Sequence, residues 1–104
     1  MTRTEFTFNI AKLIFFAQSN SFDLVGGWWL RDEETQKRMF NDGKSECDGI
    51  KKRSAHQKGM AIDFYVIKNG KISEDKTIYN KLHERWEQLG GKPMIEWDMG
   101  HFEG

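Results

Sequence analysis

Residues 60–71 have the sequence MAIDFYVIKNGK, and this stretch decides the expected fold. Met60 to Ile67 is rich in β-branched and aromatic residues, which favour a strand. The KNGK that ends the stretch is typical of a tight hairpin turn, so a short return strand is expected after it. Strand alternation places Asp63 on the face opposite Ile62. A carboxylate with apolar neighbours is costly unless it is paired or bound to a metal, so Asp63 needs a partner.

Three stretches are predicted to be helices. Apolar residues recur at three- and four-residue spacing from about Thr4 to Gln18, and again from Asp75 to Leu89, where two glycines close the pattern. Residues 32–40, DEETQKRMF, begin with acids and carry bases near the end, as suits a helix dipole. The NDG that follows marks the end of this third helix.

The remaining elements are expected to be short strands. Asp23 to Leu30 is predicted to be a strand whose two glycines mark a bulge or a close backbone approach. Met94 to Glu103 is predicted to be a strand, or a turn followed by a strand. Helices and strands do not alternate, and the strands are few and hairpin-linked. We therefore expect an α+β fold with a small antiparallel sheet and helices packed on one side.

Length and composition favour a single domain over residues 1–104, expected to be a monomer. Sixteen basic residues balance 16 acidic ones, which argues against a nucleic-acid partner. The single cysteine, Cys47, excludes an internal disulfide framework and a multi-thiolate zinc knuckle. The longest apolar stretch, Ile10 to Ala17, is short and contains Lys12, so neither a signal peptide nor membrane insertion is expected.

Two short segments hold the candidate chemistry. SAHQKGMAID, residues 54–63, places His56 seven residues before Asp63. WDMGHFE, residues 97–103, places Asp98 three residues before His101, with Gly100 between them to allow a tight bend. Two histidines and one carboxylate form a ligand set of the type that catalytic zinc sites use, with a fourth position left for water or substrate. Asp98 can then serve as a general base outside the ligand set.

These residues also have structural interpretations, which the residues alone leave open. Asp63 can face water or meet a lysine or arginine, while His56 and His101 can be an ordinary loop histidine and a packed one. Further expectations concern the surroundings of the site. Glu96 and Glu103 are either hydrogen-bond partners of a metal-ligating histidine or solvated surface residues. Trp28 and Trp29 are both predicted in the core, the alternative being that one of them lines a groove, and His83 is predicted to be partly exposed.

The two segments together resemble a known family. Ser-x-His-x-x-Gly-x-Ala-x-Asp from Ser54 to Asp63, followed by Asp-x-x-His-Phe-Glu from Asp98, is similar to the zinc D-alanyl-D-alanine carboxypeptidase and L-alanyl-D-glutamate endopeptidase family. Phage endolysins belong to this family. Arg31, with Gln36 five residues later, resembles the family's Arg-x-x-x-x-Gln. The resemblance implies a fold like that of the hedgehog domains and the DD-peptidases.

Carried onto this sequence, the resemblance assigns a role to each motif residue. It implies that zinc is bound by His56, Asp63 and His101. It implies that Asp98 is the catalytic base and that Arg31 polarises the substrate carbonyl or stabilises the oxyanion. Gln36 and Ser54 are expected to support the site rather than to act in it.

The resemblance also implies a substrate and a setting. The implied substrate is the peptide stem of bacterial peptidoglycan, and the bond expected to be cut is the L-alanyl-D-glutamate bond. The implied enzyme is a phage or prophage endolysin. Such an enzyme is expected to accumulate in the cytoplasm of the producing cell and to reach the cell wall at lysis. One alternative is a D-alanyl-D-alanine carboxypeptidase or dipeptidase. Others are a non-catalytic zinc-binding interaction module on the same fold, against which Asp98 and Arg31 argue, and a metal-free interaction domain.

Overall fold

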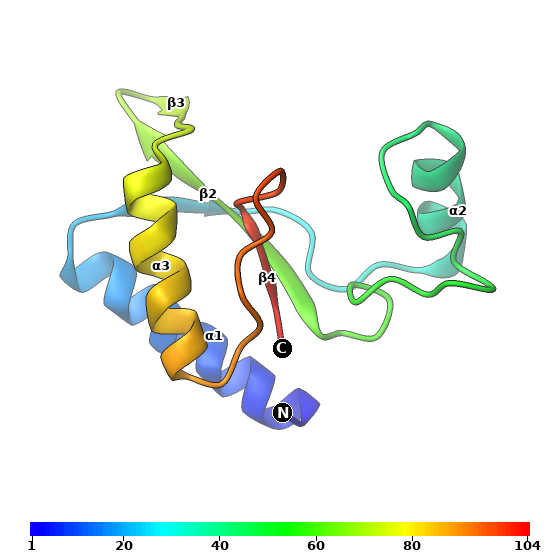
Figure 1. Ribbon diagram of the computed structural model, residues 1–104, viewed down its shortest axis with the longest axis horizontal. Helices are drawn as coiled ribbons and strands as arrows, with labels where there is room; N and C mark the ends of the chain where they lie inside the picture. The colour runs from blue at the N-terminus through cyan, green and yellow to red at the C-terminus, as the bar shows by residue number, and fades with distance from the viewer.

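The computed structural model describes residues 1–104 and contains three helices and a four-stranded antiparallel sheet (Figure 1). The elements in chain order are α1 (Arg3–Ser19), β1 (Asp23–Gly26), α2 (Glu33–Asn41), β2 (Ala61–Lys68), β3 (Lys71–Ile72), α3 (Lys76–Gln88) and β4 (His101–Glu103). The predicted α+β class is confirmed. None of the three helices is both long and apolar enough to cross a membrane.

Strand β2 is the centre of the sheet, and each of the other strands pairs with it in antiparallel fashion. The second half of β2 lies against β1 and β3, whereas its first half lies against β4. In the register of β2 and β4, Asp63 is directly opposite His101. Directly opposite residues point to the same face of a sheet, so this register brings the two side chains together.

The hydrophobic core lies between α1, α3 and one face of β2. Strand β2 contributes Ile62, Phe64 and Val66 at every second position, as the alternation of a strand requires. The buried residues of α1 follow helical spacing: Phe6, Ile10, Leu13 and Ala17. Full burial of a leucine or phenylalanine contributes about 1.5–3 kcal/mol, so burial of this face is a large favourable term in folding. Figure 1 shows α1 and α3 together on one side of β2, whereas α2 lies apart from them.

Local capping fixes where the helices begin. At the start of α1, the Thr2 hydroxyl accepts from the Glu5 amide, and the Glu5 carboxylate accepts from the Thr2 amide. The Asp32 carboxylate accepts from the Thr35 amide at the start of α2, at 2.7 Å. Each cap satisfies amides that have no partner within the first helical turn. Asp32, the first of the acids expected at the start of α2, therefore has a direct structural role.

The strand predicted from Asp23 to Leu30 is too long, because β1 ends at Gly26. The main chain stays beside β2 for two more residues, where the Gly27 amide donates to Asp63 O and the Asp63 amide donates to Trp28 O. A Cβ at Gly27 would lie 2.9 Å from the Tyr65 ring, so glycine permits this close approach. At the other end of the chain, Met94 to Glu103 forms a turn followed by a short strand, as one of the two expectations stated.

Two predictions about burial are wrong. Trp28 and Trp29 are not core residues, since 44% and 38% of their surface is exposed. They follow the end of β1, so strand alternation no longer directs them inward. His83 is 2% exposed rather than partly exposed, and its ring stacks on Phe102 with a centroid distance of 4.0 Å.

Candidate metal centre

Three predicted ligands meet at the start of β2. The Oδ1 atom of Asp63 lies 3.3 Å from His56 Nε2 and 3.4 Å from His101 Nδ1. One potential ligand atom from each residue lies within 4.8 Å of the other two. His56 and Asp63 are buried and His101 is largely so. The three side chains are therefore close enough to share one metal ion.

Different elements position these three side chains. Asp63 and His101 come from the paired strands β2 and β4, while His56 comes from the turn that precedes β2. This turn is held by a reciprocal pair of hydrogen bonds: the Gln57 amide donates to the Ser54 hydroxyl, and the Ser54 amide donates to Gln57 Oε1. Gly59 follows with φ +68°, a backbone conformation that favours glycine. The structure thus places Ser54 as a support of the turn that carries His56.

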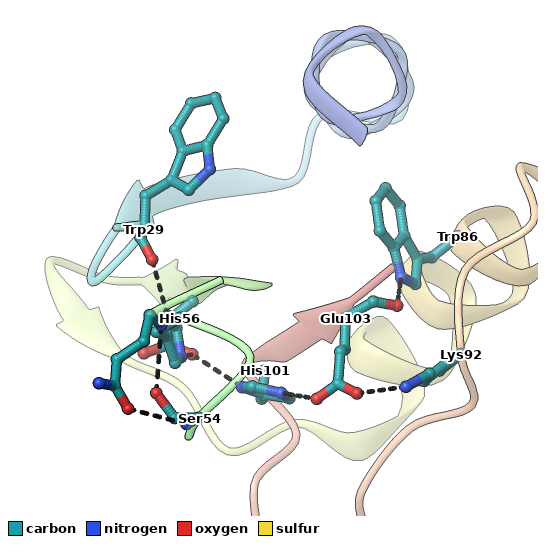
Figure 2. A network of polar contacts seen from close by, with 9 residues as sticks. Trp29, Ser54, His56, Trp86, Lys92, His101 and Glu103 are labelled. Carbon is teal, nitrogen blue, oxygen red and sulfur yellow. Dashed lines mark hydrogen bonds and ion pairs between the residues drawn. The ribbon is translucent and has the colours of Figure 1, made fainter. Parts of the chain in front are cut away.

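The outward-facing ring nitrogens of both histidines have acceptors (Figure 2). His56 Nδ1 lies 3.0 Å from the Trp29 carbonyl, and His101 Nε2 lies 3.0 Å from Glu103 Oε1. Carbonyl and carboxylate oxygens only accept, so each of these nitrogens carries the proton. In a neutral ring the other nitrogen then presents a lone pair. Both lone pairs are available on the side that faces Asp63.

The potential ligand atoms of this cluster favour a cation between them. Asp63 Oδ1 is buried without a hydrogen-bond partner. A buried carboxylate oxygen beside two imidazole lone pairs is unfavourable unless a proton or a metal ion lies between them. Two imidazoles and one carboxylate match the ligands of catalytic zinc sites, and other divalent transition ions accept the same donors. The residues present therefore fit a divalent metal.

Electrostatics at the cluster favours a proton on His101 when no metal is bound. Burial raises the pKa of Asp63, but the ring nitrogens of His101 and His56, 3.4 and 3.3 Å from its Oδ1, outweigh it and bring the pKa to about 2. Burial lowers the pKa of His101, but Asp63 and Glu103 outweigh it and leave the pKa above its ordinary value. Without a metal, the raised pKa of His101 favours a proton on this ring beside the ionised Asp63. A divalent metal ion would replace that proton.

A pocket of about 690 Å³ opens over the cluster, and Asp98 and Arg31 line it. Asp98 lies in the turn before β4, where the His101 amide donates to Asp98 O. The residue is exposed, yet desolvation by the pocket walls raises the pKa of its carboxyl. His83 anchors this turn to α3, because its Nε2 lies 2.7 Å from the Met99 carbonyl. Asp98 thus shares the pocket with the three potential ligands and remains open to solvent.

Arg31 is buried and held in place by its neighbours. Its Nη1 donates to Gln36 Oε1 at 2.8 Å, and its guanidinium lies 5.1 Å from the centre of the Trp28 ring. Gln36 is fully buried and donates in turn to Ser45 Oγ and the Cys47 carbonyl, each at 2.7 Å. Arg31 Nε is buried without a partner. The structure therefore places Gln36 as a support of Arg31.

Several residues of the pocket were not anticipated from the sequence. Tyr65 and Trp97 line it, and Trp97 is 84% exposed. Strand alternation carries a signal for Tyr65, which lies two residues after Asp63 on the same face. Of the two glutamates considered as histidine partners, only Glu103 has that role, because Glu96 pairs with Lys76 Nζ at 2.8 Å.

Comparison of the chain with protein-family models finds no match, and comparison with curated proteins finds none either.

Proposed function

We propose that the chain is a zinc-dependent peptidase that hydrolyses the peptide stem of bacterial peptidoglycan at the L-alanyl-D-glutamate bond. The observation that carries the proposal is the convergence of His56, Asp63 and His101 beside a pocket that Asp98 and Arg31 also line. The paired sequence motifs support the choice of zinc and of the substrate. The expected setting is a monomeric phage or prophage endolysin that is released from the cytoplasm at lysis.

Amide hydrolysis requires a strong nucleophile and stabilisation of the negative charge that develops on the carbonyl oxygen. His56, Asp63 and His101 would hold zinc, which would supply Lewis acidity and a more acidic water at this site. Asp98 accepts a proton from the attacking water at its carboxylate and later donates it to the leaving amine nitrogen. The raised pKa of Asp98 suits the first half of this role, because a stronger base takes the proton more readily.

Arg31 is suited to the developing negative charge. Its guanidinium is fixed by Gln36 and the Trp28 ring, and the residue lines the pocket beside the three potential ligands. A donor that is already oriented loses little energy to reorganisation when the charge appears. We therefore assign Arg31 to the substrate carbonyl oxygen.

The test is hydrolysis of purified peptidoglycan by the zinc-loaded protein, followed by mass spectrometry of the fragments. The expected product carries a new glutamate amino terminus, and a chelator abolishes its formation. Asp98→Ala lowers the rate about 10²–10⁴-fold while zinc remains bound. Asp42→Ala, which removes an exposed carboxylate after α2, is the matched control and leaves the rate unchanged.

Other results would redirect or refute the proposal. Release of terminal D-alanine would make the protein a D-alanyl-D-alanine carboxypeptidase. Bound zinc without any cleavage would indicate a non-catalytic zinc-binding module. Hydrolysis that survives the chelator, or that Asp98→Ala leaves intact, would contradict the mechanism.

A further inference from the structure

The two histidines of the metal centre are oriented by different kinds of acceptor (Figure 2). His56 faces a neutral main-chain carbonyl, that of Trp29, through Nδ1. His101 faces a carboxylate, that of Glu103, through Nε2. Hydrogen bonds to an ionised acceptor are roughly twice as strong as neutral ones. The orientation of His101 is therefore determined by a side chain that mutation can remove.

Glu103 is itself held on several sides. Its Oε2 lies 2.7 Å from Lys92 Nζ, while Oε1 faces His101. Its main-chain carbonyl accepts from the indole Nε1 of Trp86 at 2.9 Å and from the Lys92 amide at 2.8 Å. Trp86 is fully buried, so the backbone of Glu103 is anchored in the hydrophobic core. The carboxylate thus has a fixed position beside the His101 ring.

We propose that Glu103 is a positioning residue that sets the metal affinity of the site through His101. Its carboxylate holds the proton on Nε2 and the ring in the plane that presents Nδ1 toward Asp63. It also makes Nδ1 a more basic metal ligand, because partial negative charge is passed through the hydrogen bond to the ring. This inference rests on the proposed metal-dependent function, but it concerns binding of the ion rather than catalysis.

Glu96 provides a matched control on the same segment of chain. Like Glu103, it is a glutamate paired with a lysine, here Lys76 at 2.8 Å. Both members of that pair are exposed, and neither lines the pocket over the metal centre. Glu96→Gln therefore removes the same charge from a comparable ion pair without touching a histidine.

The experiment measures zinc affinity by competition with a chromophoric chelator in four proteins: wild type, Glu103→Ala, Glu103→Gln and Glu96→Gln. Glu103→Ala is expected to weaken binding about 10–100-fold. Glu103→Gln is expected to lose less, because its amide oxygen still accepts from His101 Nε2. Glu96→Gln is expected to match the wild type. Thermal unfolding of the metal-free proteins establishes that each variant folds, and Glu103→Gln carries the test if Glu103→Ala does not.

A spectroscopic readout separates orientation of His101 from a general loss of stability. In the zinc-loaded wild type, the His101 Nε2 proton is expected to give a slowly exchanging imidazole resonance in the proton NMR spectrum. That resonance should move in Glu103→Gln and stay in place in Glu96→Gln.

The outcomes distinguish this inference from the proposed function. A wild-type protein that binds no zinc would overturn both. A wild type that binds one zinc, with both Glu103 variants at wild-type affinity, would overturn the role of Glu103 alone. An equal loss in Glu103→Gln and Glu96→Gln would also overturn it, because the effect would then follow net charge.

Discussion

The two faces of β2 obey the same alternation but solve different physical problems. One face carries Phe64 and Val66 into the core beneath α1 and α3, where burial alone stabilises them. The other carries Asp63 and Tyr65 into the pocket, where Asp63 Oδ1 is buried without a hydrogen-bond partner. The first face is complete in the folded chain. The second presents three side chains that could hold a metal ion, and we therefore propose it as the functional face.

The largest expected effect comes from breaking the apolar face. Phe64 is buried and meets the Phe102 ring edge to face at a centroid distance of 5.9 Å. Phe64→Ala removes this packing and leaves a cavity, so the free energy of unfolding should fall by about 3–5 kcal/mol. Urea denaturation of the metal-free protein measures the change.

The control for this variant is an apolar residue on the same sheet that is not buried. Ile72 on β3 is 62% exposed, so Ile72→Ala should change the free energy of unfolding by no more than about 0.5 kcal/mol. Equal losses in the two variants would contradict the assignment of the core to the inner face of β2.

A smaller effect, specific to the polar face, is expected from zinc. A ligand that binds only the folded state at one hundred times its dissociation constant stabilises that state by about 2.7 kcal/mol. Wild-type protein should show this increase in the free energy of unfolding, and Asp63→Asn should lose most of it because a charged ligand is gone. Denaturation with and without zinc measures the difference.

Asp23→Asn is the control for the removal of an acid from the sheet. Asp23 lies on β1, is exposed and does not line the pocket, so this variant should keep the full stabilisation by zinc. If Asp63→Asn responded to zinc as strongly as Asp23→Asn does, the metal would have to bind elsewhere on the chain.

The sequence was sufficient to predict the core-facing side of β2 and the three potential metal ligands, but not the residues that surround those ligands. The strand from Met60 and the amphipathic spacing of α1 and α3 follow from local pattern, and the motifs single out the three residues that meet at the centre. His83 shows a missed signal. It lies four residues after Tyr79 and three before Trp86, both buried, so the helical stripe already placed it inward.

Other features had no signal in the local sequence. The pairing of Asp63 with His101 is one example, because only the register of β4 against β2 decides which residues lie opposite each other. Trp28 and Trp29 are exposed because the chain leaves the sheet after Gly26, a consequence of its path beside Asp63 and Tyr65. These contacts join residues that are distant along the chain, which periodicity does not report.

The smallest expected effect on the polar face is a gradual change of zinc affinity with pH. Burial lowers the pKa of His101, but Asp63 and Glu103 outweigh burial, so the metal-free protein retains this proton to a higher pH than an ordinary histidine does. Zinc must displace the proton, and its apparent affinity should therefore fall as the pH drops below the pKa of His101. Loss of one proton predicts about a tenfold fall per pH unit, or about 1.4 kcal/mol. Above that pKa the affinity should level off.

The pKa of Asp63, at about 2, lies well below this range, so its carboxylate does not contribute to the slope of affinity against pH. Competition titrations between pH 5 and pH 8, a range of about three units around the ordinary histidine pKa, measure the profile. A flat profile would mean that no proton is exchanged for zinc, and that the ion does not bind at His101.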